Sequence, residues 1–370
     1  MAEALSLQKL ADDLRHAGSP WEMDPRTDMA QMTEDERRVR LGFTPPPGEM
    51  SFDQAVRASD AARPLTAQEI AMQAAAAPAA YDLRNVAGKN FTTPVRNQGG
   101  CGSCVAFGTV AVLETTAKRM RNDPNLAIDL SEAHMFYCHA REEGRTCANG
   151  WWPDNAFKKA AEKGVTYDEY FRYTAGDQGC ALQGGWTDAL ATSTGHTLLD
   201  SPAKMKERIS TKGSITGCFV VYQDFFSYRS GVYRHVSGTA AGGHCVEILG
   251  YDDAQGCWIC KNSWGANWGE GGYFRIAYGQ CNIESWSGPY GVEGVLLRTW
   301  SRDIRITGLW TNDSDRNAYV HLSGVGWRQV ARATTAVQHT MLGQLVTAKA
   351  ANRRVDALQD NNQIRQVYVI

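Results

Sequence analysis

The chain has 370 residues, and its content of 43% hydrophobic and 21% charged residues is typical of a globular protein. A net charge of −2 gives no electrostatic reason to expect nucleic acid or an anionic membrane surface as the main partner. No run of 18 apolar residues occurs, so we expect no membrane span. The length suggests two or three domains.

Residues 1–79 are predicted to form a separate N-terminal extension. Helical patterns cover 5–16 and 33–43, and a further helix is predicted from Phe52. The sequence PPPG at 45–48 separates these helices, because proline and glycine interrupt regular structure.

Three further features describe this extension. Thr33 and Glu36 have the spacing of a capping box, which marks the start of a helix. An Ala-rich stretch, AMQAAAAPAA at 71–80, closes the extension. The first thirty residues are polar and charged, and they lack the apolar core of a secretory signal.

Residues 98–104 read QGGCGSC, and an apolar run that predicts a helix follows at once. The N-terminus of a helix offers unpaired N–H groups and the positive end of the helix dipole. A thiol placed there ionises more easily, and the thiolate is the nucleophilic form. Cys104 is therefore the strongest candidate in the chain for a reactive group.

The region around Cys104 is predicted to be helical and the region after it rich in strands. Helical patterns cover 105–120, 131–140 and 152–164. Alternating apolar residues and Gly-rich turns predict strands over 191–295. A helical layer that faces a sheet leaves a cleft between them, and ligand sites are common in such clefts.

Two segments of the strand-rich half carry further polar candidates. His244 lies in the strand-like run AGGHCVEILGY, and Asn262 follows a strand-like run in CKNSWGANWGEGGYFRI. A Cys, a His and an Asn far apart in sequence become neighbours in some folds.

These three blocks, in this order, resemble the papain-like cysteine peptidases over residues 81–294. The resemblance rests on GCGSC, on the Gly-His step before an apolar strand, and on NSWG followed by W and GYFR. It implies an α+β fold with a helical lobe and a β-barrel-like lobe over 80–297. With additional segments at both ends, the chain resembles a bacterial-type member of the family.

The resemblance implies four catalytic roles. Cys104 is expected to be the nucleophile, and His244 the imidazolium that holds the thiolate and later protonates the leaving amine. Asn262 is expected to orient the ring of His244. Gln98 is expected to donate its side-chain N–H to the developing oxyanion, together with the backbone N–H of Cys104.

Five residues are expected to surround the substrate. In the family a Cys-x-Gly-Gly turn presents its backbone to the substrate; here Gly150 remains and Trp151 replaces the second glycine. Trp151 either narrows the cleft, stacks on a substrate side chain or belongs to the core. Gly243 stands where the family commonly has an acidic or polar residue, and Trp264 is expected to shield the Asn–His bond. Trp286 is expected to form the floor of the main specificity pocket, which favours small or apolar side chains.

All ten cysteines lie in the region that resembles the peptidase. So many cysteines are unusual for a reducing cytosol and favour an exported protein, although no signal is visible. The resemblance implies the disulfides Cys101–Cys147 and Cys138–Cys180.

The pairing of five further cysteines stays open: Cys218, Cys245, Cys257, Cys260 and Cys281. Two of them form a CxxC, but no second CxxC or His pair completes a metal site, so a buried strand is the favoured interpretation. We therefore expect no metal and no cofactor.

Residues 298–370 hold no cysteine and show a different pattern. They predict three strands, then a helix over 337–353, then strands at 354–360 and 363–370. This is the element order of a small oligonucleotide/oligosaccharide-binding (OB) barrel, and it also resembles the small barrel subunits of bacterial toxins. The domain is either a binding module with a protein or glycan ligand, or a packing domain that supports the catalytic unit.

The sequence therefore predicts a cysteine endopeptidase that acts on protein or peptide substrates through a thioester. The extension 1–79 is expected to be an inhibitory pro-segment in the cleft, so that trimming near 77–81 raises activity. Two alternatives stay open. One is a catalytically silent relative that serves as a binding or adaptor protein, and the other is a papain-fold acyltransferase or deamidase.

Overall fold

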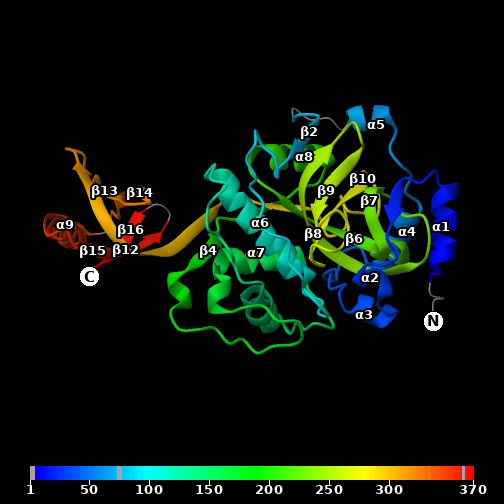
Figure 1. Ribbon diagram of the computed structural model, residues 1–370, viewed down its shortest axis with the longest axis horizontal. Helices are drawn as coiled ribbons and strands as arrows, with labels where there is room; N and C mark the ends of the chain where they lie inside the picture. The colour runs from blue at the N-terminus through cyan, green and yellow to red at the C-terminus, as the bar shows by residue number, and fades with distance from the viewer. Residues whose placement is uncertain (1–4, 73–76, 333, 361–362) are drawn as a thin grey trace. The chain divides into compact units, whose positions relative to one another are not determined.

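The computed structural model describes residues 5–72, 77–332, 334–360 and 363–370 (Figure 1). The chain divides into two compact units. The first comprises the residues up to Leu182 and Ser193–Val295, and the second comprises Gln183–Thr192 and Leu296–Ile370. No helix among the described residues has the length and apolar composition needed to traverse a bilayer.

The N-terminal extension folds as short helices that belong to the first unit. The predicted capping box is confirmed, since Thr33 and Glu36 make both of its hydrogen bonds. Residues 73–76 of the Ala-rich stretch lie outside the described residues. The elements are α1 (Leu7–His16), β1 (Trp21–Met23), α2 (Asp28–Gln31), α3 (Glu34–Arg38), α4 (Phe52–Asp60) and α5 (Ala67–Met72).

The helix predicted over 33–43 is correct only in its first half. It ends at Arg38, residues 39–40 form a turn, and the chain then continues without helix to the isolated β-bridge of Phe43. The reason is tertiary: the backbone N–H groups of Arg40 and Leu41 still donate to the last turn of the helix, but the Arg40 carbonyl and residues 42–44 bond to distant parts of the first unit.

The helical lobe is built around α6, which is buried from Cys104 to Lys118. The two disulfides expected from the resemblance, Cys101–Cys147 and Cys138–Cys180, are present in this lobe. The elements of the region are β2 (Ala80–Asp82), α6 (Cys104–Met120), the π-helix η1 (His134–Ala140), η2 (Arg141–Glu143), α7 (Pro153–Glu162), β3 (Val165–Thr166) and η3 (Asp168–Tyr170).

The other lobe is a nine-stranded sheet in the order β1-β7-β10-β9-β8-β6-β11-β5, with β2 paired to β8. Helix α6 packs against β8. Gly108 permits this approach, since a Cβ at that position would lie 3.2 Å from Cys245 Sγ. The further elements are β5 (His196–Leu198), α8 (Pro202–Thr211), β6 (Ile215–Tyr222), η5 (Gln223–Ser227), β7 (Tyr228–Tyr233), β8 (Ala240–Asp252), β9 (Cys257–Lys261), β10 (Tyr273–Ala277) and β11 (Tyr290–Val292).

The second unit has the predicted order of three strands, a helix and two strands. Its strands pair in a closed circuit, β12-β13-β14-β16-β15 and back to β12, around a core that includes Val320, Leu345 and Ile364. Only the β14–β16 pair is parallel in this circuit. The elements are η4 (Trp186–Asp188), β4 (Leu190–Ser193), β12 (Val295–Thr311), β13 (Ala318–Leu322), β14 (Gly326–Val330), α9 (Thr335–Ala350), β15 (Arg354–Asp360) and β16 (Gln363–Val369).

Candidate active site

Cys104 is the first residue of α6, as the sequence predicts. The preceding residue, Ser103, makes no side-chain cap, so the helix N-terminus keeps its backbone donors free of a local side-chain acceptor. Backbone hydrogen bonds from Cys245, Gly42 and Val105 reach the sulfur of Cys104. The thiol therefore lies where α6, strand β8 and the N-terminal extension meet.

His244 and Asn262 are brought together by the pairing of two strands. His244 lies in β8 and Asn262 directly follows β9, which is antiparallel to β8. The ring nitrogen Nε2 of His244 lies 2.8 Å from the Asn262 side-chain oxygen. Trp264 stacks on the imidazole with ring centroids 4.8 Å apart, and it covers the pair as predicted. The other ring nitrogen of His244, Nδ1, has no hydrogen-bond partner among the described residues.

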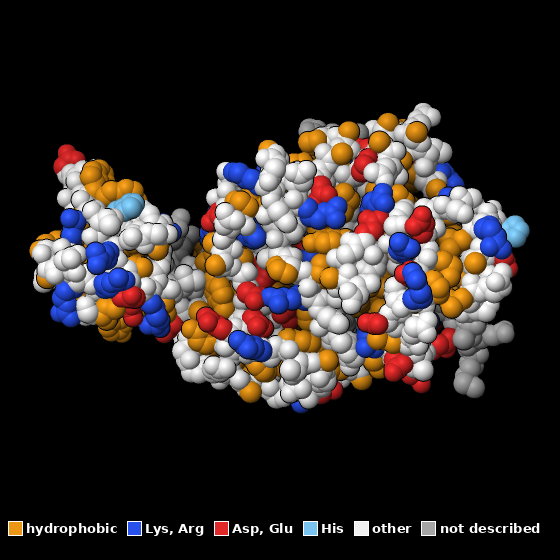
Figure 2. Space-filling model, viewed as in Figure 1, with side chains coloured by type: hydrophobic (Ala, Val, Ile, Leu, Met, Phe, Trp, Pro, Cys, Tyr) orange, Lys and Arg blue, Asp and Glu red, His pale blue; other side chains and the backbone are white. Residues whose placement is uncertain are grey.

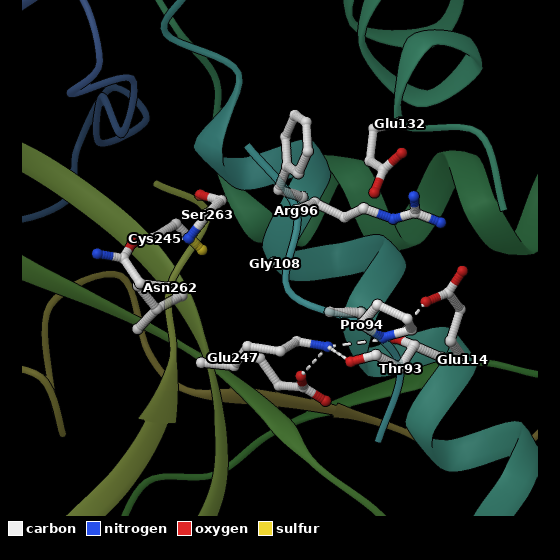
Figure 3. Close-up of a pocket in the computed structure, with 14 residues that line it drawn as sticks. Thr93, Pro94, Arg96, Gly108, Glu114, Glu132, Cys245, Glu247, Asn262 and Ser263 are labelled. Atoms are coloured by element: carbon white, nitrogen blue, oxygen red, sulfur yellow. Dashed lines mark hydrogen bonds and ion pairs between the residues drawn. The ribbon is translucent and has the colours of Figure 1, made fainter. Parts of the chain in front are cut away.

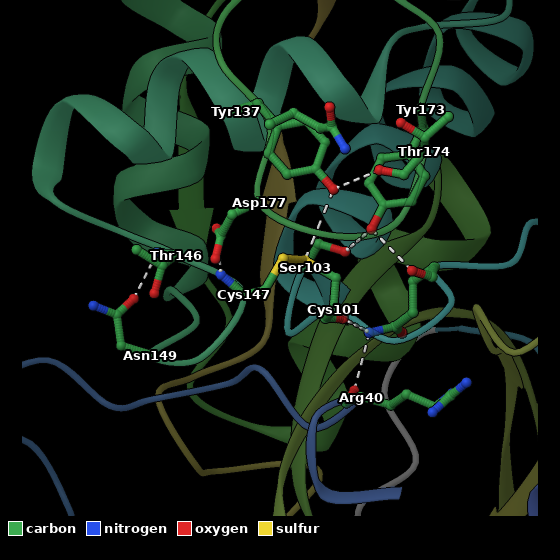
Figure 4. Close-up of a disulfide and its surroundings, with 12 residues drawn as sticks. Arg40, Cys101, Ser103, Tyr137, Thr146, Cys147, Asn149, Tyr173, Thr174 and Asp177 are labelled. Atoms are coloured by element: carbon green, nitrogen blue, oxygen red, sulfur yellow. Dashed lines mark hydrogen bonds between the residues drawn. A yellow bond between two sulfur atoms is a disulfide. The ribbon is translucent and has the colours of Figure 1, made fainter. Parts of the chain in front are cut away.

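Gln98 is fixed by hydrogen bonds at both ends of its amide. Its oxygen accepts a bond of 2.6 Å from the Ser263 hydroxyl. Its nitrogen donates to the carbonyl oxygens of Cys101, at 2.8 Å, and of Arg40, at 3.0 Å. Figure 4 shows Arg40 close to Cys101 of the disulfide. The amide donor that the sequence assigns to the oxyanion is thus already bonded to a carbonyl of the N-terminal extension.

Residues 40–44, which we call the cleft segment, fill the space between the two lobes. The backbone N–H of Trp151 donates to Gly42 at 2.9 Å, and Thr44 donates back to Trp151 at 3.0 Å. On the opposite side the N–H of Phe43 donates to Gly243 at 3.0 Å. Gly42 lies so close to the loop before Cys104 that an added Cβ would be 1.9 Å from the Gly102 oxygen. The cleft segment therefore occupies the substrate's expected place.

The residues that were predicted to surround the substrate differ in how they lie relative to the cleft segment. The backbone of Trp151 bonds to the cleft segment, while its buried indole N–H donates to Glu143 at 2.8 Å. Of the three interpretations, the core residue fits this geometry. Gly150 and Gly243 both pass so close to the cleft segment that a side chain would collide with its backbone.

Trp286 packs against Phe43 of the cleft segment. The two rings meet edge to face with centroids 4.6 Å apart. Trp286 is fully buried, and its indole N–H donates to the carbonyl of Met50 at 2.9 Å. An aromatic side chain of the extension thus lies where the sequence predicts an apolar specificity pocket.

The pKa values of Cys104 and His244 indicate that both groups are neutral in this structure. Burial raises the pKa of Cys104 to about 12, although the backbone hydrogen bonds oppose that shift. Burial also lowers the pKa of His244 to about 4, and the bond to Asn262 only partly offsets it. At neutral pH both groups are therefore uncharged, and they do not form a thiolate–imidazolium pair.

A buried polar network lies behind Asn262 and links the two lobes. Lys261 Nζ is 2.9 Å from Glu247 and donates to the Thr93 carbonyl at 3.2 Å. Thr93 in turn donates its hydroxyl to Glu114 of α6 at 2.6 Å. Burial lowers the pKa of Lys261, but the charges of Glu247 and Glu114 more than offset it, so the ammonium is retained. Figure 3 shows Thr93 between Glu247 and Glu114, with Asn262 on the side of Glu247.

The sequence analysis did not identify this network. The sequence does contain one indication of the network, which is a charged residue in an otherwise apolar strand. Glu247 interrupts the run HCVEILGY, and Lys261 follows CWIC. Buried charges of opposite sign are expected to pair, but sequence alone does not show which partner each one finds.

Comparison with known proteins agrees with this geometry. Residues 77–288 match the model of the papain family of cysteine proteases. Cathepsin B-like CP2 of Giardia intestinalis is 40% identical over 205 residues, which are 51% of this chain and 66% of that protein. A gut-specific cysteine proteinase of Caenorhabditis elegans is 30% identical over 312 residues, which are 76% of this chain and 90% of that protein.

Solved structures show the same architecture. The structure of proCathepsin B S9 from Trypanosoma congolense superimposes with a TM-score of 0.62 at 22% identity, over 78% of this chain and 98% of that one. Digestive procathepsin L 3 of Tenebrio molitor gives 0.59 at 20% identity, over 77% and 87%. The two-lobed α+β fold is confirmed, and the chain belongs to the papain family of cysteine proteases.

Proposed function

We propose that the processed protein is an endopeptidase in which Cys104 attacks the peptide carbonyl and forms a thioester. The observation that carries this proposal is the Asn262–His244 pair, which leaves Nδ1 of the imidazole without a hydrogen-bond partner in the described part of the chain, next to Cys245, whose backbone contacts Cys104. An imidazole held by one nitrogen offers the other to a thiol.

The steps follow from these contacts. When the cleft is open to water, the burial that keeps both groups neutral is relieved, and the Cys104 proton passes to His244 Nδ1. The thiolate adds to the carbonyl, and the oxyanion accepts hydrogen bonds from the Gln98 amide and the Cys104 N–H. His244 returns the proton to the leaving amine, and water then hydrolyses the thioester with His244 as the base.

Latency follows from the cleft segment. Its Arg40 carbonyl accepts the hydrogen bond of the Gln98 amide, so that this donor is not available to an oxyanion. Its Gly42 covers Cys104, and its Phe43 packs against Trp286, where the substrate side chain would bind. We propose that residues 1–79 are an inhibitory pro-segment, that 80–297 are the peptidase domain, and that cleavage near 77–81 releases it. Phe43 also supports an apolar or aromatic preference in that pocket.

Product analysis separates this function from its alternatives. The chain, processed at its 77–81 junction, is incubated with a peptide library and with a primary amine. We expect products that gain one water per cleavage, with apolar residues preferred two positions before the broken bond. Products joined to the amine, or conversion of glutamine to glutamate without cleavage, would indicate a transferase or a deamidase. Absence of any turnover would indicate a silent adaptor.

Acid is expected to loosen the cleft segment. The pKa of His244 is about 4 when the segment covers it and returns toward its ordinary value of about 6.5 when the cleft opens. The open state therefore binds more protons, and lowering the pH from about 6.5 to about 4 favours opening by at most about tenfold per pH unit. Hydrogen exchange of residues 40–44 in the Cys104→Ala chain, corrected for intrinsic rates, measures this shift. In the double variant Cys104→Ala/His244→Ala, the corrected exchange rate of residues 40–44 should not change between about pH 6.5 and about pH 4.

The core should not weaken in the same range. Burial raises the pKa of Glu114 to about 7, and burial with the charge of Glu114 raises that of Glu132 to about 8. A raised carboxyl pKa stabilises the fold at mildly acidic pH, and this contribution is lost as the pH rises from about 4.5 through these values. Acid thus opens the cleft while these two groups stabilise the fold.

We further propose an OB-like domain over 298–370 with a protein or glycan ligand. The closed strand circuit and the helix between its third and fourth strands support this proposal. Two disulfides support an exported protein that folds under oxidising conditions. Kinship with bacterial-type members of the family stays a prediction.

A further inference from the structure

The outward face of β12, β13 and β14 in the second unit carries a row of exposed aromatic side chains. Trp310 is 47% exposed and Trp327 is 50% exposed. The inward residues of the same strands, such as Val320 and Leu322, form the core of the unit. These two tryptophans therefore do not serve to fill the core, and their exposure needs another reason. Figure 2 shows hydrophobic side chains gathered beside a histidine at this part of the molecule.

Strand register brings the aromatic rings into one continuous surface. Trp310 lies opposite Tyr319, with ring centroids 5.5 Å apart and planes inclined by 60°. On the same face His321 lies opposite Trp327, with centroids 5.2 Å apart at 67°. We call these four residues the aromatic face.

A glycine makes room for one of the rings. Gly308 lies opposite His321, and a Cβ at this position would be 2.9 Å from Cη2 of Trp327 and 3.1 Å from Cβ of His321. The Trp327 ring therefore extends across β12, above a residue that has no side chain. The aromatic surface therefore extends over the three strands β12, β13 and β14.

Polar groups border the aromatic face, and its four residues include no Lys, Arg, Asp or Glu. The hydroxyl of Thr307 bonds to the His321 ring and also donates to the His321 carbonyl at 3.3 Å. The amide of Gln329 lies opposite Tyr319. Thr307, Gly308 and Gln329 lie on the same side of the sheet as the four aromatic residues, and the exposed Arg305 lies two residues before Thr307 on β12.

We propose that the aromatic face binds a neutral oligosaccharide, which deepens the glycan ligand put forward under Proposed function and is independent of peptide hydrolysis. A sugar ring has apolar C–H faces that stack on indole rings, while its hydroxyls bond to polar side chains at the border. Single-stranded nucleic acid also stacks on aromatic rings, but proteins that bind it line the path of the phosphates with basic side chains. The aromatic face is bordered on β12 by one arginine, Arg305, and not by a row of basic side chains, which favours a neutral ligand.

The test uses the full chain carrying Cys104→Ala, probed on an array of neutral glucose, galactose, mannose and N-acetylglucosamine oligosaccharides. Sialylated oligosaccharides and single-stranded oligothymidine are included. We expect binding to at least one neutral class, and a loss of about tenfold or more in affinity for Trp310→Ala and for Trp327→Ala. Gly308→Val, which displaces the Trp327 ring without removing it, should also weaken binding.

Tyr368→Ala is the matched control. Tyr368 is 58% exposed and lies on β16, where it pairs with Trp300 away from the aromatic face. Its loss should leave binding unchanged, and all four variants should melt at the temperature of the parent chain. Three results would overturn the proposal: no neutral oligosaccharide bound, preferred binding of oligothymidine, or equal loss in Tyr368→Ala. Peptide hydrolysis by the processed Trp310→Ala protein should be unaffected, so the two proposals fail separately.

Discussion

Replacing Cys104 with alanine should lower kcat/KM of the processed protein by about 10⁴-fold or more, because the attacking sulfur is lost while the oxyanion donors remain. His244→Ala should cause a loss of similar size, since the thiol then has no proton acceptor. The double variant should be little worse than either single variant, because the two residues act as a unit. Initial rates on a short peptide substrate measure all three.

Cys257→Ala provides a matched control for these variants. Cys257 is also a buried free thiol, but it begins β9 at the far end of the strand from Asn262. Its replacement is expected to reduce stability slightly and to leave kcat/KM within about threefold. Turnover that survives in Cys104→Ala but is lost in Cys257→Ala would contradict the assignment of the nucleophile.

Gly42→Ala is expected to activate the unprocessed chain. Alanine tolerates the backbone conformation of Gly42, but its Cβ would lie 1.9 Å from the Gly102 oxygen and 2.4 Å from the Gly102 Cα. Both contacts are with backbone atoms, so neither gives way by rotation of a side chain. The cleft segment has to leave, which frees Gln98 and exposes Cys104. We expect peptide hydrolysis by the full-length chain to rise by about tenfold or more.

Gly179→Ala is the corresponding control, since nothing lies within 4 Å of a Cβ at that position. Full-length Gly179→Ala should stay as latent as the parent chain. A Gly42→Ala chain that remains latent, with its cleft segment still protected from hydrogen exchange, would show that the observed contacts are not what blocks the site.

Local sequence was sufficient to predict the groups that carry the chemistry. Cys104 was identified from a glycine-rich loop that leads into an apolar run, and that run is α6. His244 and Asn262 were identified from two strand-like runs, and the antiparallel pairing of β8 and β9 places their side chains 2.8 Å apart. Alternation and turn residues likewise gave the element order of the second unit.

Features that depend on long-range contacts were not predictable. Residues 39–43 were predicted as helix, yet the helix gives way to a turn and a non-helical segment, because Gln98, Trp151 and Gly243 supply hydrogen bonds to this segment. The direction of the Trp151 side chain depends on Glu143, which no spacing rule connects to it. Residues 183–192 belong to the second unit although about a hundred residues of the first unit follow them in sequence.

The most direct test is the labelling of Cys104 by a cysteine-directed epoxide, followed by peptide mass mapping before and after processing. We predict no adduct in the full-length chain at neutral pH, and one adduct after processing, located on Cys104 and abolished by His244→Ala. Equal labelling of both forms, or an adduct on another of the free thiols, would contradict the assignment of a covered nucleophile beside His244.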